Sequence, residues 1–146
     1  MKRLLLPDIL KGFAVFLIVP VHILELFIDS MNIIDLSDEE LAEIAHPMWD
    51  DLITYSNKGQ YGKFIRKFSY ELLLGLNEVE LGKQFAHSEL SRNLVEERDF
   101  LGFIRRGEHV TALYRVRSTV KPGEYIGRMV LGYEKGEVRI FAASIF

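Results

Sequence analysis

The sequence predicts an α+β domain in which N-terminal helices pack on a four-stranded antiparallel meander, preceded by a separate hydrophobic helix. Two patterns carry this prediction. Apolar residues recur every three or four positions from Leu41 to about Phe85, which is the spacing of amphipathic helices. From Asp99 onward the period changes to two, the spacing of strands. Helices followed by a run of strands favour an α+β arrangement.

The chain opens with an apolar stretch, residues 9–28, that could cross a bilayer as a helix of roughly 30 Å. Lys2 and Arg3 precede it, which favours a cytoplasmic N-terminus and an external remainder. Lys11 within the stretch and Pro20 in its middle oppose a simple span. We expect an anchor or signal segment with membrane contact through residues 9–28; a helix packed on the domain or on a partner chain, and a gene-start artefact, are the alternatives.

This pattern divides the chain into residues 1–30, the hydrophobic helix, and residues 31–146, the α+β domain. The predicted localisation is membrane-anchored or exported, with residues 31–146 outside the cytoplasm. If Met31 is the true start, the domain is cytoplasmic instead.

A short motif in the opening segment bears a resemblance of its own. The run Asp8-Ile9-Leu10-Lys11-Gly12-Phe13-Ala14, followed by His22, resembles the first transmembrane helix of multi-span membrane acyltransferases over residues 6–28. Lys11 stands where those enzymes usually have Arg, and Pro7 where they have Leu. No second apolar span follows. The resemblance therefore implies an acyltransferase-derived fragment fused to an unrelated domain.

Composition excludes several kinds of site. The chain has no Cys, so it has neither disulfides nor a thiolate metal site. None of its four His lies three to five residues from another, so the paired-His spacing of a zinc site is missing. The net charge of −3 opposes general nucleic-acid binding. We predict no metal site, no cofactor and no nucleic-acid partner.

The first helix of the domain should begin at a capping box, in which Ser37 caps and Glu40 reaches back. Its apolar stripe is made by Leu41, Ile44, Ala45, Met48, Trp49, Leu52 and Ile53. Pro47 should kink this helix or divide it in two, and Asn57-Lys58-Gly59 should end it.

Two further helices are expected before the strands. The spacing of Tyr61, Phe64 and Phe68 predicts a second helix running to about Leu74. Asn77 with Glu80 resembles a new cap, and Leu81 and Phe85 then share one side of a short third helix.

Four strands are predicted over residues 99–106, 110–116, 125–133 and 138–146. The turns between them are Arg106-Gly107-Glu108, Lys121-Pro122-Gly123 and Lys135-Gly136. Connections this short favour an antiparallel meander.

In this order of helices and strands the chain resembles the cystatin-like superfamily, which includes the nuclear-transport-factor-2-like domains. Within that superfamily it resembles small bacterial domains of no assigned function. The resembling elements are Tyr61-Gly62-Lys63-Phe64, Phe68-Ser69, Leu72 to Leu76, Glu80-Leu81, Gln84-Phe85 and the closing hairpins, within residues 38–146. The resemblance implies a curved sheet wrapped around a helix, with a cone-shaped cavity between them. Folds of this kind host isomerases, dehydratases and cyclases as well as non-catalytic ligand binders, so the fold does not choose the function.

Catalytic residues are not predicted, because no two acid–base candidates share a recognisable spacing. The candidates are His46, His109 and Asp99, of which one would have to serve as a base in the cavity. For a small apolar ligand the predicted lining residues are Trp49, Tyr55, Tyr114, Tyr125 and Tyr133. Alternatively, these rings simply fill the core.

The strands also predict an interface. Arg115 and Arg117 share one strand face with Leu113, and Arg139 is expected to share a face with Phe141 and Ile145. Such a mixed face suits a protein interface, and we expect a homodimer through the sheet. The alternative is a solvated face whose arginines pair with nearby Glu residues.

The first functional hypothesis is thus a non-catalytic domain for a small ligand or a protein partner. A small cavity enzyme of the isomerase or hydratase type is the alternative, and the acyltransferase-derived fragment is the third.

Overall fold

The computed structural model describes residues 32–76 and 89–146, which belong to one compact unit, Asn32–Phe146. Its helical elements are η1 (Ile33–Asp35), α2 (Asp38–Lys58), α3 (Tyr61–Phe64), α4 (Tyr70–Leu74) and α6 (Glu89–Arg92). The strands are β1 (Asp99–Arg106), β2 (His109–Arg117), β3 (Glu124–Glu134) and β4 (Glu137–Ile145). The predicted helix over residues 9–28 and the predicted third helix, which includes Leu81 and Phe85, lie outside the described residues.

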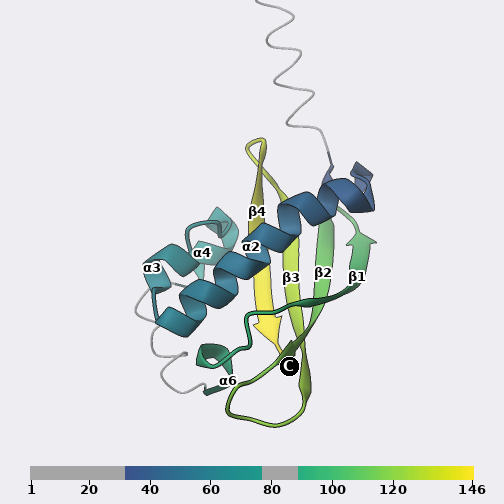
Figure 1. Ribbon diagram of the computed structural model, residues 1–146. Helices are drawn as coiled ribbons and strands as arrows, with labels where there is room; N and C mark the ends of the chain where they lie inside the picture. The colour runs from purple at the N-terminus through teal and green to yellow at the C-terminus, as the bar shows by residue number, and fades with distance from the viewer. Residues whose placement is uncertain (1–31, 77–88) are drawn as a thin grey trace, which may run out of the picture. The chain divides into compact units, whose positions relative to one another are not determined.

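The four strands form one antiparallel sheet in the order β1-β2-β3-β4 (Figure 1). This is the predicted meander, and each strand lies where the period-two spacing placed it. The two tight turns contain Gly107 and Gly136, whose φ angles of 62° and 79° suit glycine. The α+β arrangement of helices packed on this sheet is confirmed.

Helix α2 runs across one face of the sheet (Figure 1). It begins with the predicted capping box, since Ser37 Oγ accepts from the Glu40 N–H (3.1 Å) and Glu40 Oε1 accepts from the Ser37 N–H (3.0 Å). It ends at Lys58, and Gly59 caps it with a φ of 67°. The helix continues through Pro47 rather than dividing there. Its apolar stripe packs on the sheet both before and after Pro47, and this packing outweighs the lost helical hydrogen bond.

The predicted helix from Tyr61 to Leu74 is instead two short helices, α3 and α4. Between them the backbone pairs with β4: the Ser69 N–H donates to the Ile140 carbonyl (2.8 Å), and the Ile140 N–H donates to the Lys67 carbonyl (2.8 Å). These groups would otherwise belong to the helical ladder, so pairing with β4 interrupts the helix. The apolar spacing was correct, but it could not reveal this long-range pairing.

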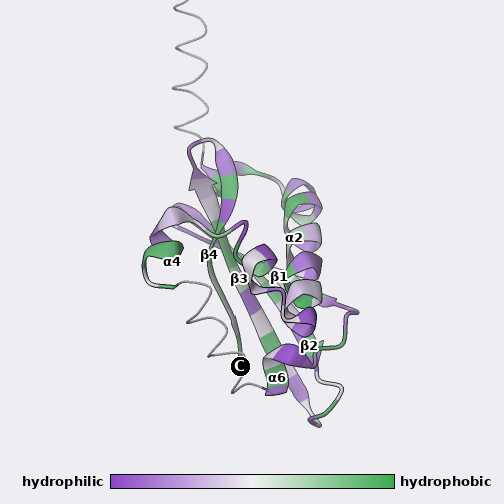
Figure 2. Ribbon diagram, turned by 90° about the vertical axis from the view of Figure 1, so that its left-hand side faces the viewer, coloured by the Kyte–Doolittle hydropathy of each residue, from purple (hydrophilic) through white to green (hydrophobic). Residues whose placement is uncertain are grey.

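The sheet has an inner face, which α2 covers, and an outer face; Figure 2 shows α2 on one side of the sheet. On β2 the inner face carries Val110, Ala112, Tyr114 and Val116, and the outer face carries Thr111, Leu113, Arg115 and Arg117. The core lies between α2 and the inner face. Its buried members include Leu41, Ala45, Trp49, Met129, Leu131 and Ile140.

A β-bulge changes which residues of β4 face the core. The pairing of β3 with β4 shifts by one residue between Val130 and Leu131, which leaves Phe141 as the extra residue. Ile145 consequently lies on the inner face, whereas Arg139 lies on the outer face. The expectation that these two residues share a face is wrong, because alternation counted across a bulge is displaced by one residue.

Arg105 joins β1 to the start of α2. Its guanidinium donates to the carbonyls of Ile34 (3.1 Å) and Leu36 (2.8 Å) and forms an ion pair with Asp38 (2.6 Å). The side chain therefore satisfies backbone groups of η1 and supports the acidic first turn of α2.

Candidate functional site

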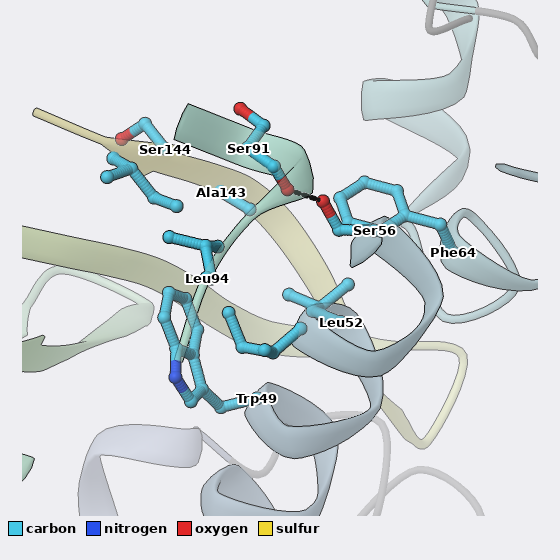
Figure 3. A pocket seen from close by; sticks show the side chains of 10 residues that line it. Trp49, Leu52, Ser56, Phe64, Ser91, Leu94, Ala143 and Ser144 are labelled. Atoms are coloured by element: carbon cyan, nitrogen blue, oxygen red, sulfur yellow. Dashed lines mark hydrogen bonds between the residues drawn. The ribbon is translucent and has the colours of Figure 1, made fainter. Parts of the chain in front are cut away.

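A crevice of about 80 Å³ lies between the C-terminal half of α2 and the end of β4 (Figure 3). Its lining comprises Trp49, Leu52, Ile53, Ser56, Phe64, Ser91, Leu94, Ala143, Ser144 and Ile145. Three parts of the chain that are far apart in the sequence, residues 49–64, 91–94 and 143–145, thus meet around one hollow.

One face of α2 supplies the largest part of the lining. Trp49, Leu52, Ile53 and Ser56 stand at positions i, i+3, i+4 and i+7, which align on one side of a helix. All four are buried. Opposite them, Ala143 and the other inner-face residues at the end of β4 complete the apolar wall.

The absence of a side chain at Gly127 fixes the position of Trp49. A Cβ at Gly127 would lie 2.4 Å and 2.5 Å from two atoms of the Trp49 indole. The indole also stacks on the ring of Tyr114, the residue that pairs with Gly127 across the sheet, with centroids 4.7 Å apart and planes at 12°. The indole therefore packs closely on the backbone of β3 at Gly127 and on a buried ring beside it.

The crevice is apolar at its floor and polar at its rim. Trp49 and Leu94 are buried, whereas Ser91 and Ser144 are half-buried, and Figure 3 shows these serines at the end opposite the indole. The Ser56 hydroxyl donates to the Ser91 carbonyl. Ser144 pairs with Arg128 on the outer face, where its Oγ accepts from Arg128 Nε at 3.3 Å. No residue of the lining is ionisable, so the crevice contains no acid or base.

A polar pair lies behind the Trp49–Tyr114 stack. The Tyr114 hydroxyl is 2.9 Å from His46 Nδ1, and the His46 ring packs against Phe100. Burial raises the pKa of Tyr114 well above its ordinary value. Burial also lowers the pKa of His46; the charge of Arg98 lowers it further, and Asp50 partly opposes this. Both side chains are thus neutral near pH 7.

The five aromatic residues predicted to bind a ligand do not gather at one place. Trp49 lines the crevice, and Tyr114 supports it from behind. Tyr125 and Tyr133 are half-buried against the core, and the Tyr125 hydroxyl donates to the Pro122 carbonyl (3.0 Å). Tyr55 is half-buried on α2 and is not part of the lining.

Several lining residues were absent from the sequence-based prediction. Ser56 could have been found from its place one helical turn beyond Leu52 on the Trp49 side of the predicted helix. Leu94, Ser91 and the β4 residues have no local signal, because only the tertiary fold brings them to α2.

A second, wider hollow of about 890 Å³ lies against the outer face beside α4. Its apolar lining includes Leu72, Leu76, Ile104, Leu113, Val130 and Phe141. Phe141 meets the His109 ring edge to face at 4.8 Å, and both rings lie over Gly132, where a Cβ would come within 3.0 Å of them. Two of the predicted interface residues, Leu113 and Phe141, therefore line this hollow.

The three predicted interface arginines already have partners within the domain. Arg117 pairs with Asp99 and Glu124, each at 2.9 Å, and Arg115 lies 3.6 Å from the same two carboxylates. Arg139 pairs with Glu137 (2.7 Å). Exposed pairs of this kind contribute little stability, but they reduce the charge that the outer face presents.

The three acid–base candidates are separated by their partners. His46 bonds Tyr114, His109 packs on Phe141, and Asp99 pairs with Arg117. No hydrogen bond or ion pair joins any two of these described residues, and none of them lines the crevice. They therefore do not form a catalytic pair.

Within residues 32–76 and 89–146, no group of His, Asp and Glu is arranged to hold a metal ion. Over the same residues, no helix combines the length and the apolar character needed to span a membrane. The predicted membrane contact through residues 9–28 falls outside them and stays a prediction.

Comparison with known proteins returns no relative. No protein-family model matches the chain, and neither the curated proteins nor the solved structures contain a significant match. The site must therefore be interpreted from its own geometry.

Proposed function

We propose that the described domain is a non-catalytic binding domain that holds the end of a slim aliphatic ligand in the crevice. The observation that carries this proposal is the lining: an apolar floor closed by Trp49 and no ionisable side chain. A concave, predominantly apolar hollow is typical of small-molecule sites.

The resemblance to the cystatin-like superfamily supports the same proposal, and membership in that superfamily is part of it. The resemblance implies a ligand cavity between a helix and the sheet that it crosses. The crevice lies between α2 and the inner face of the sheet, which is the corresponding place.

The size of the crevice indicates the shape of the ligand. Its volume of about 80 Å³ is about half of the ~150 Å³ of an engineered apolar cavity that admits benzene. A ring would require the walls to move, whereas an unbranched chain fits end-on.

The alternative of a small cavity enzyme has weaker support. An isomerase or hydratase needs a base within hydrogen-bond reach of its substrate. The lining contains no ionisable side chain, and His46, which bonds Tyr114 behind the Trp49 indole, is not part of it.

The test uses the single tryptophan of the chain as its reporter. Straight-chain primary alcohols are titrated into the full-length protein while Trp49 emission is followed. We expect saturable changes whose affinity rises roughly fourfold per methylene, or about 0.8 kcal/mol, until the floor is filled. Branched isomers with the same number of carbons should bind more weakly.

Two matched variants locate the site. Ala143→Leu places a larger side chain in the crevice and should abolish the saturable change. Ala142→Leu makes the same substitution on the neighbouring residue, which pairs with Val130 on the outer face, and should leave binding intact. Equal binding by both variants, or equal affinity for linear and branched alcohols, would overturn the proposal.

A further inference from the structure

The outer edge of β1 is open. β1 is the first strand of the sheet order, and among the described residues no strand pairs with its second edge (Figure 1). A strand of this kind presents a row of N–H and C=O groups that can pair with another chain. At eight residues, β1 is long enough to form a full ladder.

This edge has little of the protection that proteins usually give to exposed strands. Lysine, proline and very short length are common devices, and β1 has none of them; the device that it does have is a bulge at Leu101. Three of its side chains are large, apolar and exposed: Phe100 (40%), Leu101 (48%) and Ile104 (47%). Arg105 does not place a free charge at this edge, because its guanidinium is bound to η1 and Asp38.

The charges at the two ends of β1 are opposite, so two antiparallel copies of the strand complement each other. Asp99 begins the strand and Arg106 ends it, and both lie on the outer face. The bulge at Leu101 shifts the register between Phe100 and Gly102. Suppose that β1 of one copy pairs antiparallel with β1 of a second copy about a two-fold axis at Phe103, and that Leu101 again stays unpaired. Gly102 then lies opposite Ile104 of the other copy, and Asp99 lies opposite Arg106.

We propose that two copies of this chain associate edge to edge, β1 against β1, in this register. The contact is isologous, so two equivalent sites form in which Asp99 of one copy, which also pairs with Arg117 of its own chain, lies beside Arg106 of the other copy. The bare backbone at Gly102 gives room to the Ile104 side chain of the second copy. Main-chain hydrogen bonds supply the affinity, as in other cases of strand addition.

The edge suits a second copy better than the outer face does. The face arginines Arg115, Arg117 and Arg139 are already paired within the chain. An antiparallel sheet can also leave one face in water. The prediction that copies meet through the sheet face is tested by the same experiment.

Two matched isoleucine variants separate the edge from the face. Ile104→Lys adds a lysine to β1, and Ile126→Lys makes the same change on β3, where Ile126 is 41% exposed on the outer face. Sedimentation velocity of the full-length chain, in one detergent buffer for all samples, gives the dimer dissociation constant. We expect Ile104→Lys to raise it at least about tenfold and Ile126→Lys to leave it unchanged.

Disulfide trapping then tests the register. The chain has no cysteine, so each variant carries a single thiol and no competing disulfide can form. In the proposed register Phe103 faces its own counterpart, at a Cα separation of about 5 Å that a disulfide can bridge. Ile104 lies diagonally from its counterpart at roughly 7–8 Å. Phe103→Cys should therefore form a disulfide-linked dimer much faster than Ile104→Cys, with circular dichroism confirming that both variants fold.

Three outcomes overturn the proposal. One is a chain that stays monomeric at every concentration. The second is loss of the dimer in Ile126→Lys, which assigns association to the face. The third is trapping of Ile104→Cys as fast as Phe103→Cys, which excludes this register.

Discussion

At the scale of single residues, one bare position organises the candidate site. The Trp49 indole lies where a Cβ on Gly127 would be, and it stacks on Tyr114 behind. Because the indole closes the floor of the crevice, the shape of the crevice depends on a residue that does not line it. Glycine is required here by close approach and not by backbone conformation, since the φ of Gly127 is not positive.

Gly127→Ala should therefore destabilise the domain, by about 1–3 kcal/mol, because the added methyl overpacks the indole against Tyr114. The free energy of unfolding from urea titration measures the loss, and a shift of Trp49 emission should accompany it. Gly75→Ala is the matched control, because a Cβ there would meet nothing within 4 Å. Equal effects of the two substitutions would show that Trp49 does not rest on Gly127.

At the scale of elements, α2 tolerates a residue that helices normally avoid. Pro47 is exposed in the interior of the helix and supplies no N–H to it. The buried residues Ala45 and Trp49 on either side are held by the sheet, so packing retains the helical path.

Pro47→Ala should stabilise the domain by up to about 3 kcal/mol, because it restores a helical hydrogen bond at a position without buried contacts. Urea titration again measures the change, and Asp51→Ala, at another exposed position of α2, should shift stability by less than about 0.5 kcal/mol. A loss of stability in Pro47→Ala would mean that the proline fixes a bend that α2 needs in order to follow the sheet.

The elements also show how far the sequence alone could reach. Local signals sufficed for the four strands, for the Ser37–Glu40 capping box and for the end of α2 at Gly59. Local signals failed where pairing with a distant segment sets the backbone conformation. Ser69 pairs with Ile140, and this pairing divides the predicted second helix. The bulge at Phe141 likewise moved Ile145 to the other face, because pairing and not spacing sets the register.

The same distinction applies to the candidate site. Trp49 was predicted to bind a ligand, and its place on α2 follows from helical spacing. The opposite wall, from Leu94 and Ala143, depends on how α6 and β4 meet the helix. No pattern within either segment encodes that meeting.

At the scale of the whole described unit, the two proposals use different ends of the sheet. The crevice lies at β4 and the open edge is β1, with β2 and β3 between them. Pairing of β1 with a second copy therefore leaves the crevice accessible. Ligand binding and association should accordingly be independent, and Ile104→Lys should not alter the affinity for alcohols.

The pH dependence of unfolding is also a property of the whole unit, and His46 gives it a direction. Burial lowers the pKa of His46 in the folded state below its ordinary value of 6.5, with Arg98 contributing and Asp50 opposing. The unfolded chain therefore takes up this proton first as the pH falls through 6.5. Stability contributed by neutral His46 is present above that pH and is lost progressively toward the lower folded pKa.

Urea midpoints measured between about pH 7.5 and pH 5 should thus decline toward acid, in the range where histidine titrates. His46→Gln should flatten this decline, because it removes the group whose protonation differs between the two states. His109→Gln makes the same substitution on the outer face and should retain the decline. If His46→Gln leaves the slope unchanged, burial and the charge of Arg98 do not disfavour the charged imidazole, and the acid sensitivity belongs to other groups.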